Sequence, residues 1–337
     1  MSDLTTKYLG LELKNPVIAG ASNMITDLNI VRDLEKAGVA AIVYKSLFEE
    51  QIQLETLQLD QDLEAYNEIH AEMTSLFPKL QHAGPEEHLH HLKEVKESID
   101  IPVFASLNAV FEPTWLEYAK KLQETGIDGL EINFYAVPKD PNKDEQKIVE
   151  EQVNILKKIK QHIKIPVAVK LSPFYTNALK VIHAMADTGV DGFVLFNRLF
   201  QPDINIDTET LHFPYNLSHP QENRLALRFA GLLYGETNAS ICANGGIFEG
   251  NDVIKMILAG ADAVQVVSTL YKNKPGYVAT ILKDVSGWME KKGYNQLEDF
   301  RGKLSRKHVK DPYAYKRAQY VDILMNAQEM EKIFPVH

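Results

Sequence analysis

Two lysines stand where short apolar segments give way to polar residues, Lys45 in the phrase VYKS and Lys170 in the phrase VKLS. A lysine at the end of a buried segment must be paired or desolvated at a cost, so two of them predict a shared anionic or electron-rich ligand. One alternative is that each lysine pairs with a structural carboxylate. Another is aldolase-type chemistry, in which a strand-end lysine acts as a Schiff-base nucleophile.

A phosphate site is predicted near the end of the same series of segments. The phrase ANGGI contains Gly245 and Gly246, whose backbone N–H groups can approach an anion closely, and VVST ends in Ser268 and Thr269, whose hydroxyls can donate to it. A Gly-Gly pair alone is weak evidence, because tight turns also use glycine. Its place after the seventh apolar run is what favours a phosphate.

Eight short apolar runs of strand length must position these residues. They cover residues 16–22, 40–46, 102–108, 129–134, 166–172, 192–197, 239–246 and 263–269. Segments of helical period separate them, several ending at a glycine suited to a helix C-cap, and phrases such as AGVAAIVYKS and AGADAVQVVS repeat one design. We therefore predict an α/β fold, a (β/α)8 TIM barrel forming a single domain over residues 1–337, with a C-terminal helical tail from about residue 293. A doubly wound sheet is the alternative, but no Gly-x-Gly-x-x-Gly turn follows the first strand.

Three long loops follow predicted strands two, four and six, at 47–84, 135–145 and 198–220. In such barrels the loops after the strands build the active site. The strand-four loop is charged and rich in proline, which suits either a lid or a solvated connector. The strand-six loop contains DINIDTETLHF, which predicts a small hairpin.

The composition limits the partners. A net charge of -10 over 337 residues argues against nucleic acid and anionic membrane, so we expect a small-molecule substrate. No apolar stretch reaches the length of a membrane span, and residues 1–10 lack the pattern of a secretory leader, so we expect a cytoplasmic protein. The single cysteine, Cys242, excludes an intrachain disulfide and is expected to be a core residue. We expect His88, His90 and His91 to lie on a solvated helix face, and we predict no metal site.

These residues resemble the FMN-dependent dihydroorotate dehydrogenases, especially the soluble forms. The resemblance rests on NPVIAGAS, YKS, LEIN, VKLSP, LFN, LSHPQENRLALR, ANGGI, AGADAVQVVSTL and LEDFRGKL, in that order along the chain. It implies an enzyme of pyrimidine biosynthesis that transfers a hydride from dihydroorotate, or a related cyclic amide, to N5 of FMN. It also implies a homodimer, with fumarate as the electron acceptor expected for the family.

The resemblance assigns roles to particular residues. Lys170 faces the N1 and C2 carbonyl end of the flavin, where a fixed cation stabilises the negative charge of the reduced ring. Substrate binding falls to Lys45, Asn133 and Asn197. The expected cofactor-binding set is Ala21, Ser22, Lys45, Ser46, Asn108, Asn133, Lys170, Ser218, Gly245, Gly246, Ser268 and Thr269.

The catalytic loop departs from the family pattern. The family places a cysteine or serine base at the position of Ala136, and alanine cannot accept a proton. We therefore assign catalysis to Lys45 and Tyr135, with Tyr135 as the base if a cation lowers its pKa from about 10. The segment YNEIHAEMTSLFPK also lacks the family's substrate-loop motif, and two of four substrate asparagines are missing. A barrel that binds FMN or a phosphorylated metabolite without oxidising dihydroorotate is the alternative.

Overall fold

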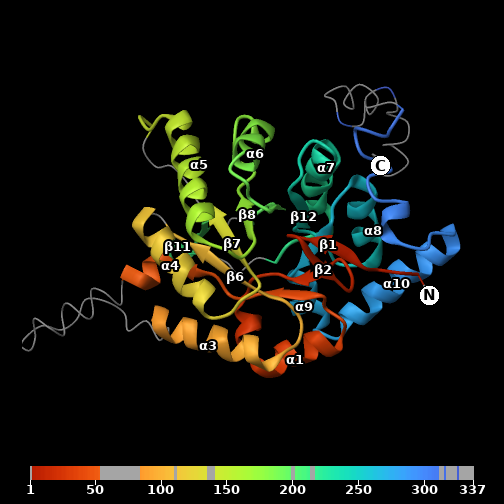
Figure 1. The fold of residues 1–337 in the computed structure, drawn as a ribbon, viewed down its shortest axis with the longest axis horizontal. Coiled ribbons are helices and arrows are strands. Elements are labelled where there is room, and N and C mark those ends of the chain that lie inside the picture. Colours follow the sequence, from red (N-terminus) through yellow and green to blue (C-terminus); the bar gives the residue numbers. More distant parts are fainter. Residues whose placement is uncertain are drawn as a thin grey trace, which may run out of the picture.

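The computed structural model describes residues 2–53, 84–109, 112–134, 141–198, 202–212 and 217–310, together with Tyr315 and Met325. Eight parallel strands form a closed ring, which confirms the predicted (β/α)8 barrel (Figure 1). The ring closes where Val266 of the last strand pairs with Ala19 of the first. In order around the barrel the strands are β3 (Val17–Ala19), β4 (Ala41–Val43), β6 (Val103–Asn108), β7 (Gly129–Phe134), β8 (Val167–Leu171), β9 (Gly192–Leu195), β12 (Ser240–Asn244) and β13 (Ala263–Val266).

Helices surround the strands (Figure 1). They are α1 (Leu28–Lys36), α3 (Pro85–Ser98), α4 (Glu112–Glu124), α5 (Glu145–His162), α6 (Ala178–Ala186), α7 (Asn223–Leu233), α8 (Gly250–Ala259), α9 (Ser268–Asn273) and α10 (Tyr277–Lys292). Local sequence sets their ends. At the start of α1 the Asp27 side chain accepts hydrogen bonds from the N–H groups of Asn29 and Ile30, and just beyond its end Gly38 has φ +99°. Barrel strands such as β6 and β7 are buried along their whole length, because helices cover their outer face.

A hairpin that the sequence analysis did not predict closes the amino-terminal end of the barrel. It consists of β1 (Thr6–Tyr8) and β2 (Leu11–Leu13), and Tyr8 packs edge-on against Phe104 of β6 with ring centroids 5.9 Å apart. The buried Arg301 fastens it by donating to Thr6 Oγ1 at 2.8 Å. The predicted strand at 40–46 is shorter in the structure, where β4 covers Ala41–Val43. A second short strand, β5 (Leu47–Phe48), follows it and pairs with β6.

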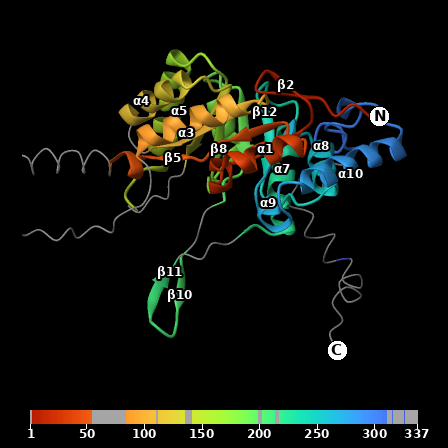
Figure 2. The same ribbon diagram turned by 90° about the horizontal axis from the view of Figure 1, so that it is seen from below.

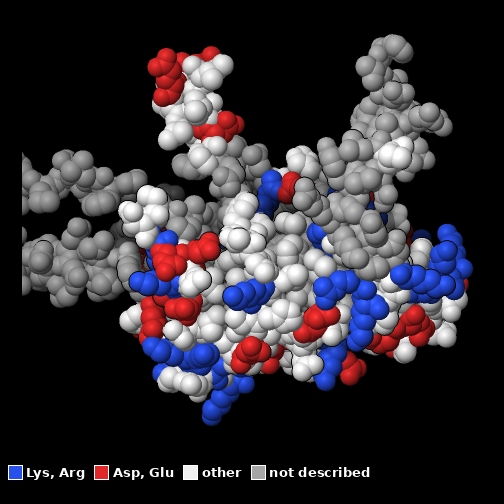
Figure 3. Space-filling model, turned by 90° about the horizontal axis from the view of Figure 1, so that it is seen from above, with Lys and Arg blue, Asp and Glu red and all other residues white. Residues whose placement is uncertain are grey.

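The hairpin predicted in the strand-six loop is confirmed as β10 (Asp203–Asn205) and β11 (Thr210–His212). It projects away from the barrel, and every residue of both strands is exposed (Figure 2). Its visible charges are acidic (Figure 3).

The expected C-terminal tail is described as far as residue 310. It forms the short 3-10 helix η3 (Leu297–Asp299) followed by turns, and apart from Tyr315 and Met325 the remainder lies outside the described residues. None of the described helices has the length and apolar character needed to cross a membrane.

Candidate cofactor and active site

A cavity of about 440 Å³ opens at the carboxyl ends of the barrel strands. All eight strands deliver residues to it, from the last two positions of a strand or from the segment that follows the strand. The predicted site residues that line it are Ala21, Ser22, Lys45, Ser46, Asn108, Asn133, Lys170, Asn197, Ser218, Gly245, Gly246 and Ser268. The sequence analysis missed Asn23, Phe48, Arg198, Leu217, Asn244, Ile247, Gln265, Val267 and Tyr271, which line it as well.

One side of the cavity is a cluster of small hydrogen-bonding groups. Ser268 Oγ accepts hydrogen bonds from the backbone N–H of Ser218 at 2.9 Å and from the Ser218 hydroxyl at 2.8 Å. The Gly246 N–H points to Ser218 Oγ at 3.4 Å. Because Ser268 Oγ is the acceptor in both bonds to Ser218, its own proton remains for a further acceptor in the cavity. This is the donor chemistry that a phosphate requires.

The two glycines of ANGGI serve different purposes. A Cβ on Gly246 would lie 2.4 Å from the backbone nitrogen of Asn223 and 2.8 Å from the carbonyl oxygen of His219, so only glycine allows this loop to touch the start of α7. A Cβ on Gly245 would meet nothing within 4 Å. Both residues have positive φ, +91° at Gly245 and +68° at Gly246, a conformation that favours glycine. The loop therefore holds its backbone at the edge of the cavity.

Thr269 is placed differently from the prediction. Its side chain is fully buried and absent from the cavity lining. The hydroxyl donates to the carbonyl oxygen of Phe248 at 3.0 Å and accepts from Asn273 Nδ2 at 3.0 Å. These bonds direct it toward the packing of α9 instead of toward a ligand.

Lys170 lies at the base of the cavity in a buried network. Its Nζ is 3.4 Å from Glu131 Oε1 and donates to Gln265 Oε1 at 3.3 Å. The sequence allowed two alternatives for Lys170, contact with a ligand or pairing with a structural carboxylate. In the structure Lys170 both lines the cavity and pairs with Glu131. Lys45 also lines the cavity but makes no ion pair among the described residues.

Amide side chains line the same cavity. Asn197 Nδ2 donates to Asn133 Oδ1 at 3.0 Å, so these two predicted substrate-binding residues lie in direct contact. Asn108 is 5% exposed, and its Nδ2 has no hydrogen-bond partner among the described residues. A buried amide without a partner is costly unless a ligand completes it. The oxygen-rich edge of a flavin and its ribityl chain would supply such an acceptor, so the residues present fit this cofactor.

The expectation of a solvated histidine face holds only in part. His90 and His91 are exposed, but His88 is 7% exposed and its ring packs edge-on against Tyr44 with centroids 5.1 Å apart. Burial, reinforced by the charge of Lys45, lowers the pKa of His88 to about 4. Burial likewise raises the pKa of Tyr44 to about 12. Across the part of the chain that the structure describes, no group of three or more His, Cys, Asp or Glu side chains could hold a metal ion.

Some predicted elements lie outside the described residues. They are Tyr135, Ala136, most of the strand-four loop and the segment YNEIHAEMTSLFPK. Their predicted roles stay predictions.

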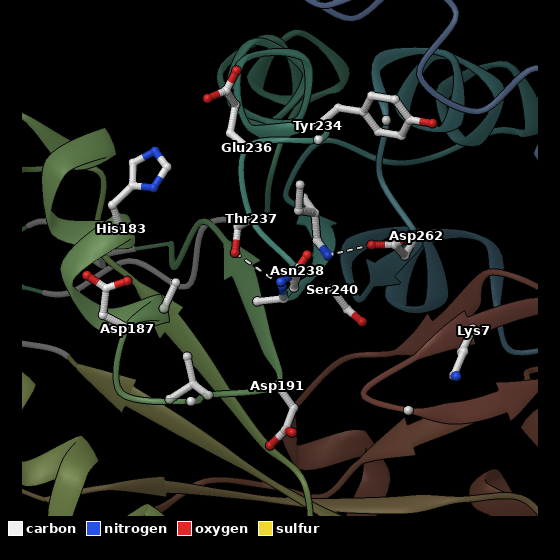
Figure 4. A pocket seen from close by; sticks show the side chains of 18 residues that line it. Lys7, His183, Asp187, Asp191, Tyr234, Glu236, Thr237, Asn238, Ser240 and Asp262 are labelled. Atoms are coloured by element: carbon white, nitrogen blue, oxygen red, sulfur yellow. Dashed lines mark hydrogen bonds between the residues drawn. The ribbon is translucent and has the colours of Figure 1, made fainter.

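A larger hollow of about 830 Å³ lies at the opposite, amino-terminal end of β9 and β12 (Figure 4). Two of its acids already have structural partners. Asp191 accepts from Val167 N–H at 2.8 Å and pairs with Lys160 at 2.5 Å, and Asp262 accepts from Ile241 N–H at 2.7 Å. Since barrel active sites form at the carboxyl ends of the strands, the smaller cavity is the candidate site.

Comparisons with known proteins point to one family. The sequence model of a family described as dihydroorotate dehydrogenase matches residues 78–289. The chain is 28% identical over 316 residues to the catalytic subunit of dihydroorotate dehydrogenase B (NAD(+)) from Thermoplasma volcanium, covering 90% of this chain and 98% of that relative. It is 31% identical over 217 residues to dihydroorotate dehydrogenase A (fumarate) from Lactobacillus helveticus, covering 61% of this chain and 68% of that relative.

The barrel has a cationic, amide-lined cavity at the carboxyl ends of its strands. One family model matches more than half of the chain. This chain belongs to the dihydroorotate dehydrogenase family.

Proposed function

We propose that the protein is an FMN-dependent oxidoreductase acting on CH–CH donors, which takes a hydride from dihydroorotate or a related cyclic amide in pyrimidine biosynthesis. One observation carries the proposal. The cavity combines the ammonium of Lys170, the unpartnered amide of Asn108 and the donor cluster around Ser268, which complement the ring edge, the ribityl chain and the phosphate of FMN. Bound FMN would supply the hydride acceptor at N5.

The chain's own residues would divide the remaining work. Ser218, Gly246 and Ser268 would bind the phosphate, and Lys170 would stabilise negative charge at the N1 end of the ring. Asn133 and Asn197, which are hydrogen-bonded to each other, would orient the cyclic amide beside Lys45. Tyr135 would remove the substrate proton, which remains part of the proposal.

The test is cofactor uptake followed by reduction. Purified protein titrated with FMN should quench flavin fluorescence, and anaerobic dihydroorotate should then bleach the flavin absorbance. Lys170→Met should weaken both, whereas Lys160→Met, which removes an ammonium at the other end of the barrel, should change neither. A wild-type protein that takes up no FMN contradicts the proposal.

Ala136 favours a second candidate, a barrel that binds FMN or a phosphorylated metabolite without oxidising dihydroorotate. Uptake of FMN without bleaching by dihydroorotate or other dihydropyrimidines supports this candidate and opposes the first. A Schiff-base aldolase is disfavoured at Lys170, since an ammonium paired with the buried Glu131 is not a nucleophile.

The proposal includes a cytoplasmic homodimer. The free, buried Cys242 fits a reducing compartment. The projecting hairpin exposes Ile204, Ile206 and Leu211 at 60%, 82% and 68%, which suits burial against a second copy. Sedimentation should give a dimer that Ile206→Asp weakens, and a monomeric wild type contradicts this part of the proposal.

A further inference from the structure

Three buried side chains form a network across the interior of the barrel, directly beneath the candidate site. Lys170 Nζ lies 3.4 Å from Glu131 Oε1 and 3.3 Å from Gln265 Oε1, and Gln265 Nε2 donates to Glu131 Oε2 at 2.5 Å. Their exposures are 7% for Lys170, 2% for Glu131 and 1% for Gln265. Each member contacts both of the others, so the network is closed.

The strands hold this network rigidly. Glu131 lies on β7 and Lys170 on the adjacent β8, whereas Gln265 comes from β13 on the opposite side of the ring. Lys170 and Gln265 both reach the cavity, but Glu131 does not line it. Glu131 therefore cannot touch a ligand in the cavity directly and acts on it only through its two partners.

Apart from Lys170, the buried groups near Glu131 do not balance its negative charge. Tyr8 and Cys242 are its buried neighbours, and burial raises the pKa of each well above its usual value, which keeps both neutral. The Glu131 carboxylate is thus balanced mainly by the Lys170 ammonium. Of this pair, only Lys170 faces the cavity. A ligand in the cavity therefore meets the positive charge of Lys170, reduced in part by the negative charge of Glu131 on its far side.

We propose that Glu131 is the positioning residue that sets the reduction potential of the bound flavin, by fixing the Lys170 ammonium and offsetting part of its charge. This inference rests on the proposed function. A reduced flavin carries negative charge at the N1 end, which an uncompensated ammonium stabilises more strongly than a paired one. Removing the carboxylate charge should therefore favour the reduced flavin.

The experiment is a spectroscopic redox titration of the FMN-loaded protein with a reference dye. Glu131→Gln keeps the shape of the side chain and should shift the equilibrium toward reduced flavin about tenfold, or about 30 mV upward for a two-electron couple. Gln265→Glu places a second carboxyl group in contact with Glu131, so the two share one proton, the charge of the network is kept, and the equilibrium should stay within about threefold of the wild type, or about 15 mV. Asp262→Asn removes a half-buried carboxylate at the other end of the barrel and should leave the equilibrium unchanged.

The double variant Glu131→Gln/Gln265→Glu is the decisive control, because it moves the carboxylate to the other partner of Lys170 and keeps the charge of the network. Its potential should return to within about threefold of the wild-type equilibrium, or about 15 mV. If thermal unfolding shows that Glu131→Gln does not fold, Glu131→Met carries the test of charge removal, and it should shift the equilibrium toward reduced flavin by a similar factor.

The outcomes separate the two proposals. FMN uptake with potentials that do not respond to these charge changes overturns the role of Glu131 and leaves the proposed function intact. A wild-type protein that takes up no FMN overturns both.

Discussion

The two ends of the barrel differ in what their polar groups lack. The hollow at the amino-terminal end is larger, about 830 Å³ against about 440 Å³, yet two of its acids, Asp191 and Asp262, accept hydrogen bonds from backbone N–H groups, and Asp191 also pairs with Lys160. The smaller cavity contains a buried amide without a partner at Asn108. Size alone would favour the amino-terminal hollow, whereas the unpartnered amide of Asn108 favours the smaller cavity as the candidate site.

The largest effect is expected when one glycine at each end of the barrel is replaced by alanine. Gly246→Ala should destabilise the loop by about 3 kcal/mol or more, since the new Cβ meets backbone atoms in a positive-φ conformation. We expect FMN affinity, measured by fluorescence quenching, to fall by at least about a hundredfold. Gly189→Ala in the amino-terminal hollow shares the positive φ but meets nothing within 4 Å, so it should cost about 1 kcal/mol and leave affinity unchanged. Equal losses of affinity in both variants would contradict the assignment.

The next test concerns the histidine buried near Lys45. The pKa of His88 falls from 6.5 to about 4 on folding, so the unfolded chain binds more protons between these values and stability rises with pH. The free energy of unfolding is not reduced by this group above pH 6.5, and it falls by about 3 kcal/mol as the pH falls to 4. Urea unfolding of His88→Phe, which keeps an aromatic ring beside Tyr44, should lack this part of the pH dependence. A wild type and variant with parallel pH profiles would show that His88 is not the titrating group.

A matched pair of asparagines tests the unsatisfied amide. Asn108→Leu removes a buried donor that has no partner, so it should stabilise the FMN-free protein by about 1 kcal/mol while lowering FMN affinity about tenfold. Asn15 is equally buried but fully bonded, donating to the Gly38 carbonyl at 2.7 Å and accepting from Val17 N–H at 3.0 Å. Asn15→Leu should therefore destabilise the fold by about 2 kcal/mol without weakening FMN binding. Thermal unfolding and fluorescence titration of both variants decide the matter, and destabilisation by Asn108→Leu would count against a ligand-facing amide.

The smallest expected effect has the opposite sign of pH dependence, at the other end of the barrel. Burial raises the pKa of Asp262 to about 6 despite the nearby Arg301, so the folded protein holds a proton that the unfolded chain releases between pH 4 and 6. Stability from this group is present at low pH and is lost as the pH rises through 6, by about 1 kcal/mol, since the side chain remains 27% exposed. The advantage of Asp262→Asn over the wild type in urea unfolding should grow over that range. A constant difference would exclude titration of Asp262.

Much of the barrel could be predicted because each strand is apolar on both faces and each helix carries its own end signals. Asp27 and Gly38 mark the two ends of α1 in the sequence as they do in the structure. The hairpin β1–β2 escaped prediction because its strands are three residues long and depend on distant partners, such as Asp262 and Arg301, which lie 256 and 295 positions from Thr6. Long-range fastening of this kind leaves no local pattern.

The candidate site divides in the same way. The gathering of strand-end residues around one cavity could be predicted, since the barrel brings all carboxyl ends together, whereas their roles stay predictions. Glu131 was not, because its partner Gln265 is 134 positions away and a carboxylate inside an apolar strand signals only a cost, without naming its partner. Thr269 was assigned by its neighbour Ser268, but α9 turns adjacent side chains to different sides, and its hydroxyl bonds to Phe248 instead.

The fastening of the β1–β2 hairpin has a consequence for synthesis of the chain. Thr6 is held by Arg301, and the Asp3 N–H donates to the Asn295 carbonyl at 2.7 Å, so the first residues made wait for some of the last. Until residue 301 has left the ribosome, the amino-terminal end of the barrel lacks the hydrogen bond from Arg301, and the β1–β2 hairpin does not yet cover the apolar side chains there. The ring itself cannot close before β13 is made, and its amino-terminal end is fastened only once Arg301 is made, so this end is completed among the last steps in the folding of a new chain.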